Sequence, residues 1–265
     1  MYRLFFLWLP LITQSSGLIA QSPEVNPAAY GIGPFVAADQ SKYALWRNVA
    51  GIASTSGWNI LVSYQFPYGL SELQNFSFGI TFPWKPRTGI SLFQFGNGPL
   101  TNQQLALNAA VNLDRINFGI RIKYWQLAFS GITSLKAVSA AAGFQGKLSD
   151  QIEAGVFVDN ILQTRIGSQE ILPLLWYSGI KFQPASHLSL HLETGYVLGQ
   201  QWRFKMGIEY RIKNRFFFRT GFEVPNLQSY FGLGFLADSV ELDYALSTHP
   251  DLGITHQAAG SYSWP

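Results

Sequence analysis

Apolar and polar residues alternate along this chain from residue 58 almost to its end. In WRFKMGIEYRI (202–212), every second residue is bulky and apolar, and most of the residues between them carry a charge. Successive side chains of a β-strand point to opposite faces, so the pattern predicts a strand with one apolar and one ionic face. The same alternation recurs in RINFGIRIKY (115–124), HLSLHLETGYVL (187–198) and SVELDYAL (239–246).

About fourteen segments of this kind follow one another, each close to the ten-residue strand length that is typical of a membrane barrel. We expect strands at 58–67, 73–82, 87–95, 102–112, 115–125, 137–148, 151–160, 174–184, 187–198, 202–212, 215–224, 227–237, 239–247 and 254–264.

The connections between these segments alternate between short and longer ones. Tight turns such as LD (113–114), SD (149–150) and KN (213–214) alternate with longer stretches such as 126–136 and 161–173. Bacterial outer-membrane barrels show this alternation, with short turns on the periplasmic side and longer loops outside. The sequence therefore predicts an even-stranded antiparallel transmembrane β-barrel in the outer membrane, with both termini in the periplasm.

A soluble β-sandwich also produces alternating strands, so other features must distinguish the two folds. Only 12% of the residues are charged, about half of the usual share in a soluble domain. Aromatic residues stand near the predicted strand ends, as expected for girdles at the two membrane interfaces: Trp58, Trp176, Trp202, Tyr210 and Trp264. These observations favour the all-β membrane barrel over the sandwich.

Composition excludes several other classes of protein. Mean hydropathy is +0.10, too low for a bundle of membrane helices, and the net charge of +3 is dispersed, which argues against a nucleic-acid partner. The chain has no cysteine, so disulfides and cysteine-ligated metals are excluded. His187 and His191 would lie about 13 Å apart on a strand, and no G-x-S-x-G motif occurs. We expect no enzyme, no metal site and no cofactor.

The first twenty residues have the pattern of a secretory signal peptide. Arg3 precedes the apolar run LFFLWLPLI, and SSGLIA leads to the polar QSPE. The run is too short to span a bilayer as a helix, which takes roughly 20 apolar residues. We expect cleavage near Ala20 or Gln21 and therefore export of the mature chain.

The polar faces of the predicted strands would line the barrel interior. Both signs occur there in similar number, so we expect ion pairs that fill a narrow lumen; a selective polar conduit is the alternative. A wide porin is disfavoured because porins have 16–18 strands. The expected interior charges are Arg121, Lys123, Glu153, Asp159, Lys181, Glu193, Arg203, Lys205, Glu209, Arg211, Arg219, Glu223, Glu241 and Asp243.

Residues 21–57 do not alternate and carry a different signal. The stretch YGIGPFVAADQSKYALWRNVAGIAS (30–54) resembles the start of FadL-like outer-membrane barrels, especially their PorV/PorQ branch. The matching residues are Gly31, Gly33, Ala37, Asp39, Ala44, Leu45, Trp46, Asn48, Ala50, Gly51 and Ala53. Val49 departs from the family's usual proline. FVDNIL (157–162) and the final two strands resemble the same branch, whose barrels have fourteen strands.

We expect three segments: a signal peptide (1–20), an N-terminal segment (21–57) with a short helix around Lys42–Trp46, and the barrel (58–265). The resemblance implies that the N-terminal segment is a plug or hatch on the periplasmic side; the alternative is that it only seals the base of the barrel. A PorV/PorQ-type protein would be a partner or cargo-handling barrel of the type IX secretion and gliding machinery of Bacteroidota. Its partners would be outer-membrane lipid, including lipopolysaccharide, and other outer-membrane or secretion-system proteins.

A FadL-type channel for hydrophobic small molecules is the alternative function, and a purely structural barrel is a third. The short predicted loops and the ionic lumen favour the secretion partner, because burying unpaired charge beside an apolar ligand costs several kcal/mol.

Overall fold

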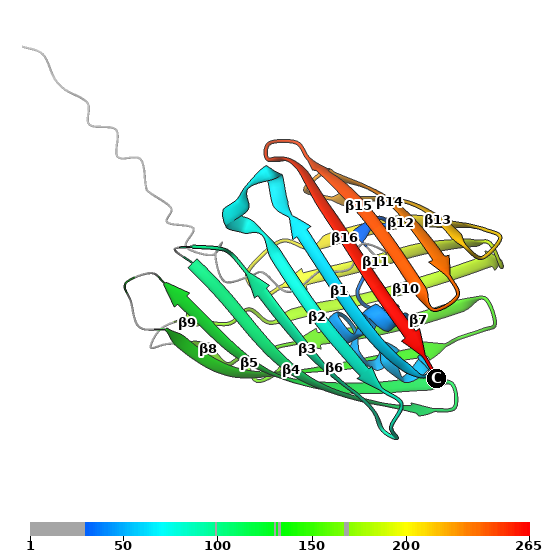
Figure 1. The fold of residues 1–265 in the computed structure, drawn as a ribbon, viewed down its shortest axis with the longest axis horizontal. Helices are drawn as coiled ribbons and strands as arrows, with labels where there is room; N and C mark the ends of the chain where they lie inside the picture. Colours follow the sequence, from blue (N-terminus) through cyan, green and yellow to red (C-terminus); the bar gives the residue numbers. More distant parts are fainter. Residues whose placement is uncertain (1–29, 99, 130, 132–133, 167–169) are drawn as a thin grey trace, which may run out of the picture.

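Antiparallel strands wind into a closed barrel in the computed structural model of this protein (Figure 1). The structure describes residues 30–98, 100–129, 131, 134–166 and 170–265, so the predicted signal peptide and its cleavage site lie outside the described residues. The barrel strands are β1 (Trp58–Phe66), β2 (Asn75–Phe82), β3 (Arg87–Phe95), β4 (Leu100–Leu113), β5 (Ile116–Phe129), β6 (Leu135–Lys147), β7 (Ile152–Asp159), β10 (Leu175–Ala185), β11 (Leu188–Val197), β12 (Arg203–Ile212), β13 (Phe216–Val224), β14 (Gln228–Ala237), β15 (Val240–His249) and β16 (Gly253–Trp264).

All of the predicted strands are confirmed. Their ends differ by a few residues, most of all in β5, which was predicted to end at 125 and continues to Phe129. The structure adds a small hairpin, β8 (Arg165–Ile166) and β9 (Glu170–Ile171), in a connection that was predicted to be a loop. Short 3₁₀ turns, η3 (Pro67–Gly69) and η4 (Ser71–Leu73), occupy the connection between β1 and β2.

The first and last strands close the barrel. β1 pairs with β16 in antiparallel register from Trp58 opposite Trp264 to Phe66 opposite His256. The indole rings of Trp58 and Trp264 stack at this seam, with centroids 5.8 Å apart and planes 6° from parallel. Closure leaves no barrel edge with unpaired backbone groups, which is the condition for a sheet to lie in hydrocarbon.

Alternation along the strands is confirmed by side-chain exposure. On β12, Phe204, Met206 and Ile208 are 56%, 57% and 45% exposed, whereas Lys205 between them is buried at 2%. The apolar side chains therefore point outward and the ionic ones inward, around a barrel whose outer surface is a continuous apolar band. Such a band is stable against lipid and would be a liability in water.

The connections alternate as predicted. Tight turns at one end, for example Lys213–Asn214 with φ of 50° and 55°, contrast with the longer stretches at the other end, such as 160–174. We call these the short-turn end and the long-loop end. The contrast disappears toward the C-terminus, where residues 225–227 connect β13 to β14 and residues 250–252 connect β15 to β16.

No helix within the described part of the chain is long and apolar enough to cross a membrane.

The N-terminal segment (residues 30–57) lies inside the barrel rather than beside it (Figure 1). It forms two 3₁₀ helices, η1 (Lys42–Trp46) and η2 (Val49–Ser54), and η1 covers the residues for which a short helix was predicted. Ser41 caps η1 by accepting a hydrogen bond from the Tyr43 amide, and Asn48 caps η2 through the Ala50 amide. Side-chain capping supplies partners for the amides that a short helix leaves unpaired.

Candidate functional site: the barrel interior

Glycines on the inner wall make room for the N-terminal segment. A Cβ atom at either Gly207 on β12 or Gly221 on β13 would collide with the carbonyl oxygen of Ile32. Gly31 lies so close to Gly232 on β14 that a Cβ on either residue would meet the other's Cα. Glycine is the residue that permits such close approach of two backbones.

The same arrangement continues around the opposite part of the wall. Gly119 on β5 faces the backbone of η2, Gly143 on β6 faces the Asn48 side chain, and Gly155 on β7 faces the Ala37 carbonyl. Gly79 and Gly89 accommodate the side chain of Leu45. Glycines from several strands thus line the path that the segment follows through the barrel.

A buried ion pair anchors the first part of the segment. The Glu193 carboxylate accepts hydrogen bonds from the amides of Val36 (2.7 Å) and Ala37 (2.6 Å). The Lys205 ammonium donates to the carbonyl of Pro34 (2.6 Å) and lies 3.4 Å from Glu193. Both charged side chains are fully buried, so each one depends on the other and on the segment's backbone for partners.

A buried arginine anchors the second part. The Arg121 guanidinium donates to the carbonyl oxygens of Leu45 (2.7 Å) and Arg47 (2.9 Å) at the end of η1. The side-chain amide of Asn48 donates to the Ala37 carbonyl (2.6 Å), and the Arg47 guanidinium donates to the carbonyl of Phe35. These bonds fix the turn that precedes η2.

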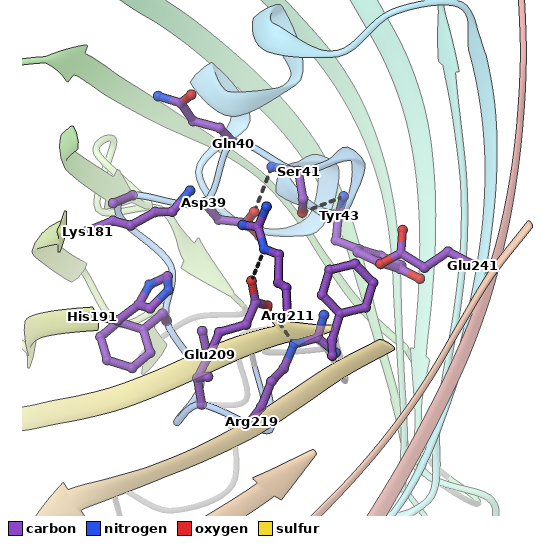
Figure 2. A pocket seen from close by; sticks show the side chains of 14 residues that line it. Asp39, Gln40, Ser41, Tyr43, Lys181, His191, Glu209, Arg211, Arg219 and Glu241 are labelled. Carbon is purple, nitrogen blue, oxygen red and sulfur yellow. Dashed lines mark hydrogen bonds and ion pairs between the residues drawn. The ribbon is translucent and has the colours of Figure 1, made fainter. Parts of the chain in front are cut away.

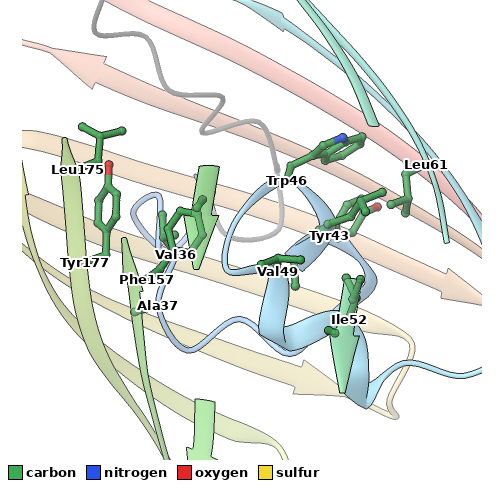
Figure 3. Packing of buried hydrophobic residues seen from close by; sticks show 14 of the residues in the cluster. Val36, Ala37, Tyr43, Trp46, Val49, Ile52, Leu61, Phe157, Leu175 and Tyr177 are labelled. Atoms are coloured by element: carbon green, nitrogen blue, oxygen red, sulfur yellow. The ribbon is translucent and has the colours of Figure 1, made fainter. Parts of the chain in front are cut away.

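Apolar packing completes the attachment of the segment (Figure 3). Tyr43, Leu45, Trp46, Val49 and Ile52 from the two 3₁₀ helices form one buried cluster with wall residues. The wall contributes Leu61, Phe157, Leu175, Tyr177 and Val197, among others. Full burial of one such aliphatic side chain is worth about 1.5–3 kcal/mol, so the cluster strongly favours the seated position.

The residues of the N-terminal motif contribute to the packing of the segment against the inner wall of the barrel. Ala44, Leu45, Trp46, Asn48, Ala50 and Gly51 are all buried among wall atoms or within the segment. Gly33 has a φ of 91°, and Gly51 packs against Asp39 and Ala44. Val49, the departure from the resembled motif, is fully buried in the apolar cluster and is the first residue of η2.

The predicted interior charges form ion pairs with one another and with the N-terminal segment. Arg219 bridges Glu209 (2.8 Å) and Asp243 (2.6 Å), and Arg211 lies 2.9 Å from Glu209. Other pairs are Lys123 with Asp159, Lys181 with Glu153 (3.4 Å), Arg203 with Glu223 (3.8 Å) and Lys205 with Glu193. Glu241 pairs across to Lys42 of the N-terminal segment (2.9 Å).

A cavity of about 300 Å³ separates the segment from the charged strands (Figure 2). Phe35, Asp39 and Tyr43 line it from the segment, and His191 and Arg211 are among the residues that line it from the wall. Burial raises the pKa of the Asp39 carboxyl above its ordinary value, while the nearby Arg47 guanidinium acts in the opposite direction. Among the described residues, no three His, Asp or Glu side chains are close enough to share a metal ion.

A different surface forms near the long-loop end. Trp125 and Leu127 on β5 and Ala137 on β6 pack with Ile166 and Leu172 from the connection that contains β8 and β9. We call these five residues the mouth cluster. Leu100 contacts both this cluster and a second buried pair, Phe93 and Phe95, on β3. The interior is therefore ionic in one region and apolar in another.

Comparison with known proteins establishes the fold. No protein-family model matches the sequence, and no curated protein matches it. The structure is similar to the CymD monoaromatic hydrocarbon channel (TM-score 0.70, 11% identity, covering 92% of this chain and 98% of that chain). It is also similar to the Pseudomonas putida toluene transporter TodX (0.69, 11%, 93% and 99%) and to a Pseudomonas aeruginosa FadL homologue (0.62, 12%, 91% and 98%).

This chain therefore shares the fold of these outer-membrane channels, a closed antiparallel β-barrel. The resemblance to FadL-like barrels is thereby supported at the level of fold. The narrower PorV/PorQ resemblance gains no support from these neighbours, which are described as channels and as a FadL homologue.

Sequence reasoning missed three features of the barrel interior. The glycine-lined path was not recognised, although Gly207 was visible as the uncharged exception on the ionic face of its strand. Arg47 and the inward-facing Phe93 and Phe95 were also overlooked. The alternation along β3 was the available signal: every second residue faces inward, so Phe93 and Phe95 lie inside whereas Leu92 and Gln94 lie outside.

Proposed function

We propose that this protein is an outer-membrane channel for small hydrophobic molecules, with its long-loop end facing outward and both termini in the periplasm. The mouth cluster carries the proposal: Trp125, Leu127 and Ile166, with their neighbours, form a buried apolar surface near the end where a substrate would enter. Ligand sites for such molecules are lined mainly by hydrophobic and aromatic side chains. The similar structures of a toluene transporter and of a monoaromatic hydrocarbon channel agree with this choice.

The ionic lumen is a weaker objection than the sequence suggested. Lys205 and Glu193 bind each other and the segment's backbone, and Arg219 is held between two carboxylates. An apolar solute beside paired charges does not leave a single charge without a partner, so the largest part of the desolvation cost does not arise. The expectation that charge disfavours a hydrophobic substrate thus loses its main basis.

The N-terminal segment would act as a plug in this channel. It is bound by buried hydrogen bonds, apolar packing and close backbone contact with glycines, so displacing it would expose each of these groups. We propose that it stays seated and excludes bulk water from the lumen.

Uptake of radiolabelled toluene by Gram-negative cells that express the protein tests the proposal, because lipopolysaccharide slows the passage of such solutes across the outer membrane. We expect wild-type protein to raise uptake at least tenfold. Leu127→Asp should remove most of the increase, because its carboxylate places a charge in the mouth cluster, whereas Leu127→Met should retain it. Uptake no faster than in cells without the protein, at equal amounts of folded barrel, would refute the proposal.

The secretion-partner hypothesis stays a prediction. Its sequence basis was the N-terminal motif, FVDNIL (157–162) and the last two strands, together with the short loops and the ionic lumen. In the structure the motif residues pack inside the barrel, which accounts for them without a secretion partner. Crosslinked isolation from native membranes tests it: stable recovery with secretion-system proteins would favour it, and recovery of the barrel alone would count against it.

A further inference from the structure

Several polar residues on one wall of the barrel have buried atoms with no hydrogen-bond partner. Among them are Asn75 and Ser77 on β2, Asn102 and Gln104 on β4, and Gln257 on β16. Each residue is at most 6% exposed. Polar groups buried in folded proteins are nearly always hydrogen-bonded, so these atoms call for an explanation.

The strand register places most of these groups side by side. Asn75 is paired with Phe95, and Phe95 is paired with Asn102 across the next ladder. One step along the barrel, Ser77 is paired with Phe93 and Phe93 with Gln104. Each phenylalanine is thus flanked on both sides by a polar residue on the same inner face.

Gln257 extends the group by one step. It is paired with Gln65 on β1, which accepts a hydrogen bond from Asn75 (2.6 Å). Both polar atoms of the Gln257 side chain are without a partner. We call Asn75, Ser77, Phe93, Phe95, Asn102, Gln104 and Gln257 the amide–phenylalanine wall.

Charge is absent from this part of the sequence. The ranges 59–65, 75–81, 89–95, 102–108 and 255–261 contain no Asp, Glu, Lys or Arg. The adjoining strand β5 carries Lys123 and Arg121 on its inner face. The Lys123 ammonium is already paired with Asp159, and the Arg121 guanidinium donates to Asn108 and to the backbone of the N-terminal segment. A carboxylate on a ligand would therefore lack a cation here, while a hydroxyl or carbonyl would find amide donors and acceptors.

We propose that the amide–phenylalanine wall is a specificity site that binds uncharged ring compounds bearing a hydroxyl or carbonyl group on their way through the barrel. The rings of Phe93 and Phe95 supply an apolar surface, and the flanking amides and hydroxyl supply hydrogen bonds. This inference rests on the proposed channel function and narrows its substrates to neutral hydrogen-bonding molecules, with carboxylates rejected.

Three probes that share one methyl-substituted ring test the site in cells: toluene, p-cresol and 4-methylbenzoate. At pH 7 p-cresol is neutral, since phenols ionise near pH 10, whereas 4-methylbenzoate is an anion. We expect uptake of p-cresol through the wild-type barrel to exceed that of 4-methylbenzoate at least tenfold. Equal uptake of the two would overturn the inference.

The double variant Asn102→Leu/Gln104→Leu removes hydrogen-bonding groups while keeping the side chains large. It should lower p-cresol uptake about tenfold and leave toluene uptake within twofold of wild type. Gln103→Leu is the matched control, because Gln103 is on the same strand but outside the barrel, and we expect it to change neither rate. Unchanged p-cresol uptake in the double variant would contradict the proposal.

Calorimetric titration of purified barrel with p-cresol separates this inference from the channel proposal. Binding that the double variant loses would support the site even if toluene uptake failed in cells. If cells take up toluene but the double variant still binds p-cresol, the channel proposal is supported and the proposed binding site is refuted. Unchanged binding with greater stability of the double variant would mean that the wall holds only water, which also overturns it.

Discussion

Two parts of the inner wall differ in the polar side chains that they carry and in how those side chains are paired. Strands β10–β15 carry most of the interior charge, and their charged groups bind one another and the N-terminal segment, as Lys205 and Glu193 do. Neutral polar groups without a partner occur on this wall too, for example Ser189 and Thr194 on β11. Strands β16 and β1–β4 carry amides, hydroxyls and two phenylalanines, several of whose polar atoms have no partner.

This difference assigns separate roles to the walls. Charge inside a low-dielectric barrel is tolerable where partners are fixed, so the charged wall is a structural element that holds the segment. Neutral polar groups cost less when unpaired and stay available to a passing solute. The wall with fewer charges is therefore the one that we expect to contact substrate.

Lys205→Met should give the largest effect on stability. The change keeps an unbranched side chain but leaves Glu193 buried without its cation, a loss of about 3–5 kcal/mol in the free energy of unfolding. Urea unfolding in lipid vesicles, followed by tryptophan fluorescence, measures it. A loss below about 1 kcal/mol would show that the charged wall does not hold the segment.

Gly221→Ala should have an intermediate effect. Its Cβ would collide with the Ile32 carbonyl, and overpacking of this kind costs about 1–3 kcal/mol. Gly260→Ala is the control, since its Cβ would meet only Leu242 at an ordinary 3.5 Å. The same unfolding measurement compares the two variants, and equal stability would contradict the tight seat of the segment.

Ser77→Ala should have the smallest effect. Its hydroxyl oxygen is buried without a partner, so removing it should change the free energy of unfolding by less than about 1 kcal/mol, in the stabilising direction. If unfolding in vesicles showed a loss above about 2 kcal/mol, the two walls would not differ as described.

The fold was predictable because a membrane barrel imposes its pattern on every strand. Phe204, Met206 and Ile208 must face lipid, so alternation is visible in the sequence without knowledge of any tertiary contact. The turn Lys213–Asn214 was likewise recognisable from local chemistry, since asparagine tolerates positive φ.

The interior was only partly predictable, because its contacts join residues far apart in the sequence. The alternation along the strands identified Glu193 and Lys205 as inward-facing. Nothing in the nearby sequence indicated that Pro34, Val36 and Ala37 would be their partners. The argument from charge to function had the same limit: the sequence shows how many charges face inward, whereas the structure shows that Lys205, Glu193 and Arg219 have charged partners.

The central claim is that the charged wall holds the N-terminal segment in place, so that the segment closes the lumen to bulk water. Ion current through single wild-type barrels in a planar bilayer tests this claim most directly. The account predicts no steady conductance above the bilayer baseline. A large, stable open-channel current would contradict it.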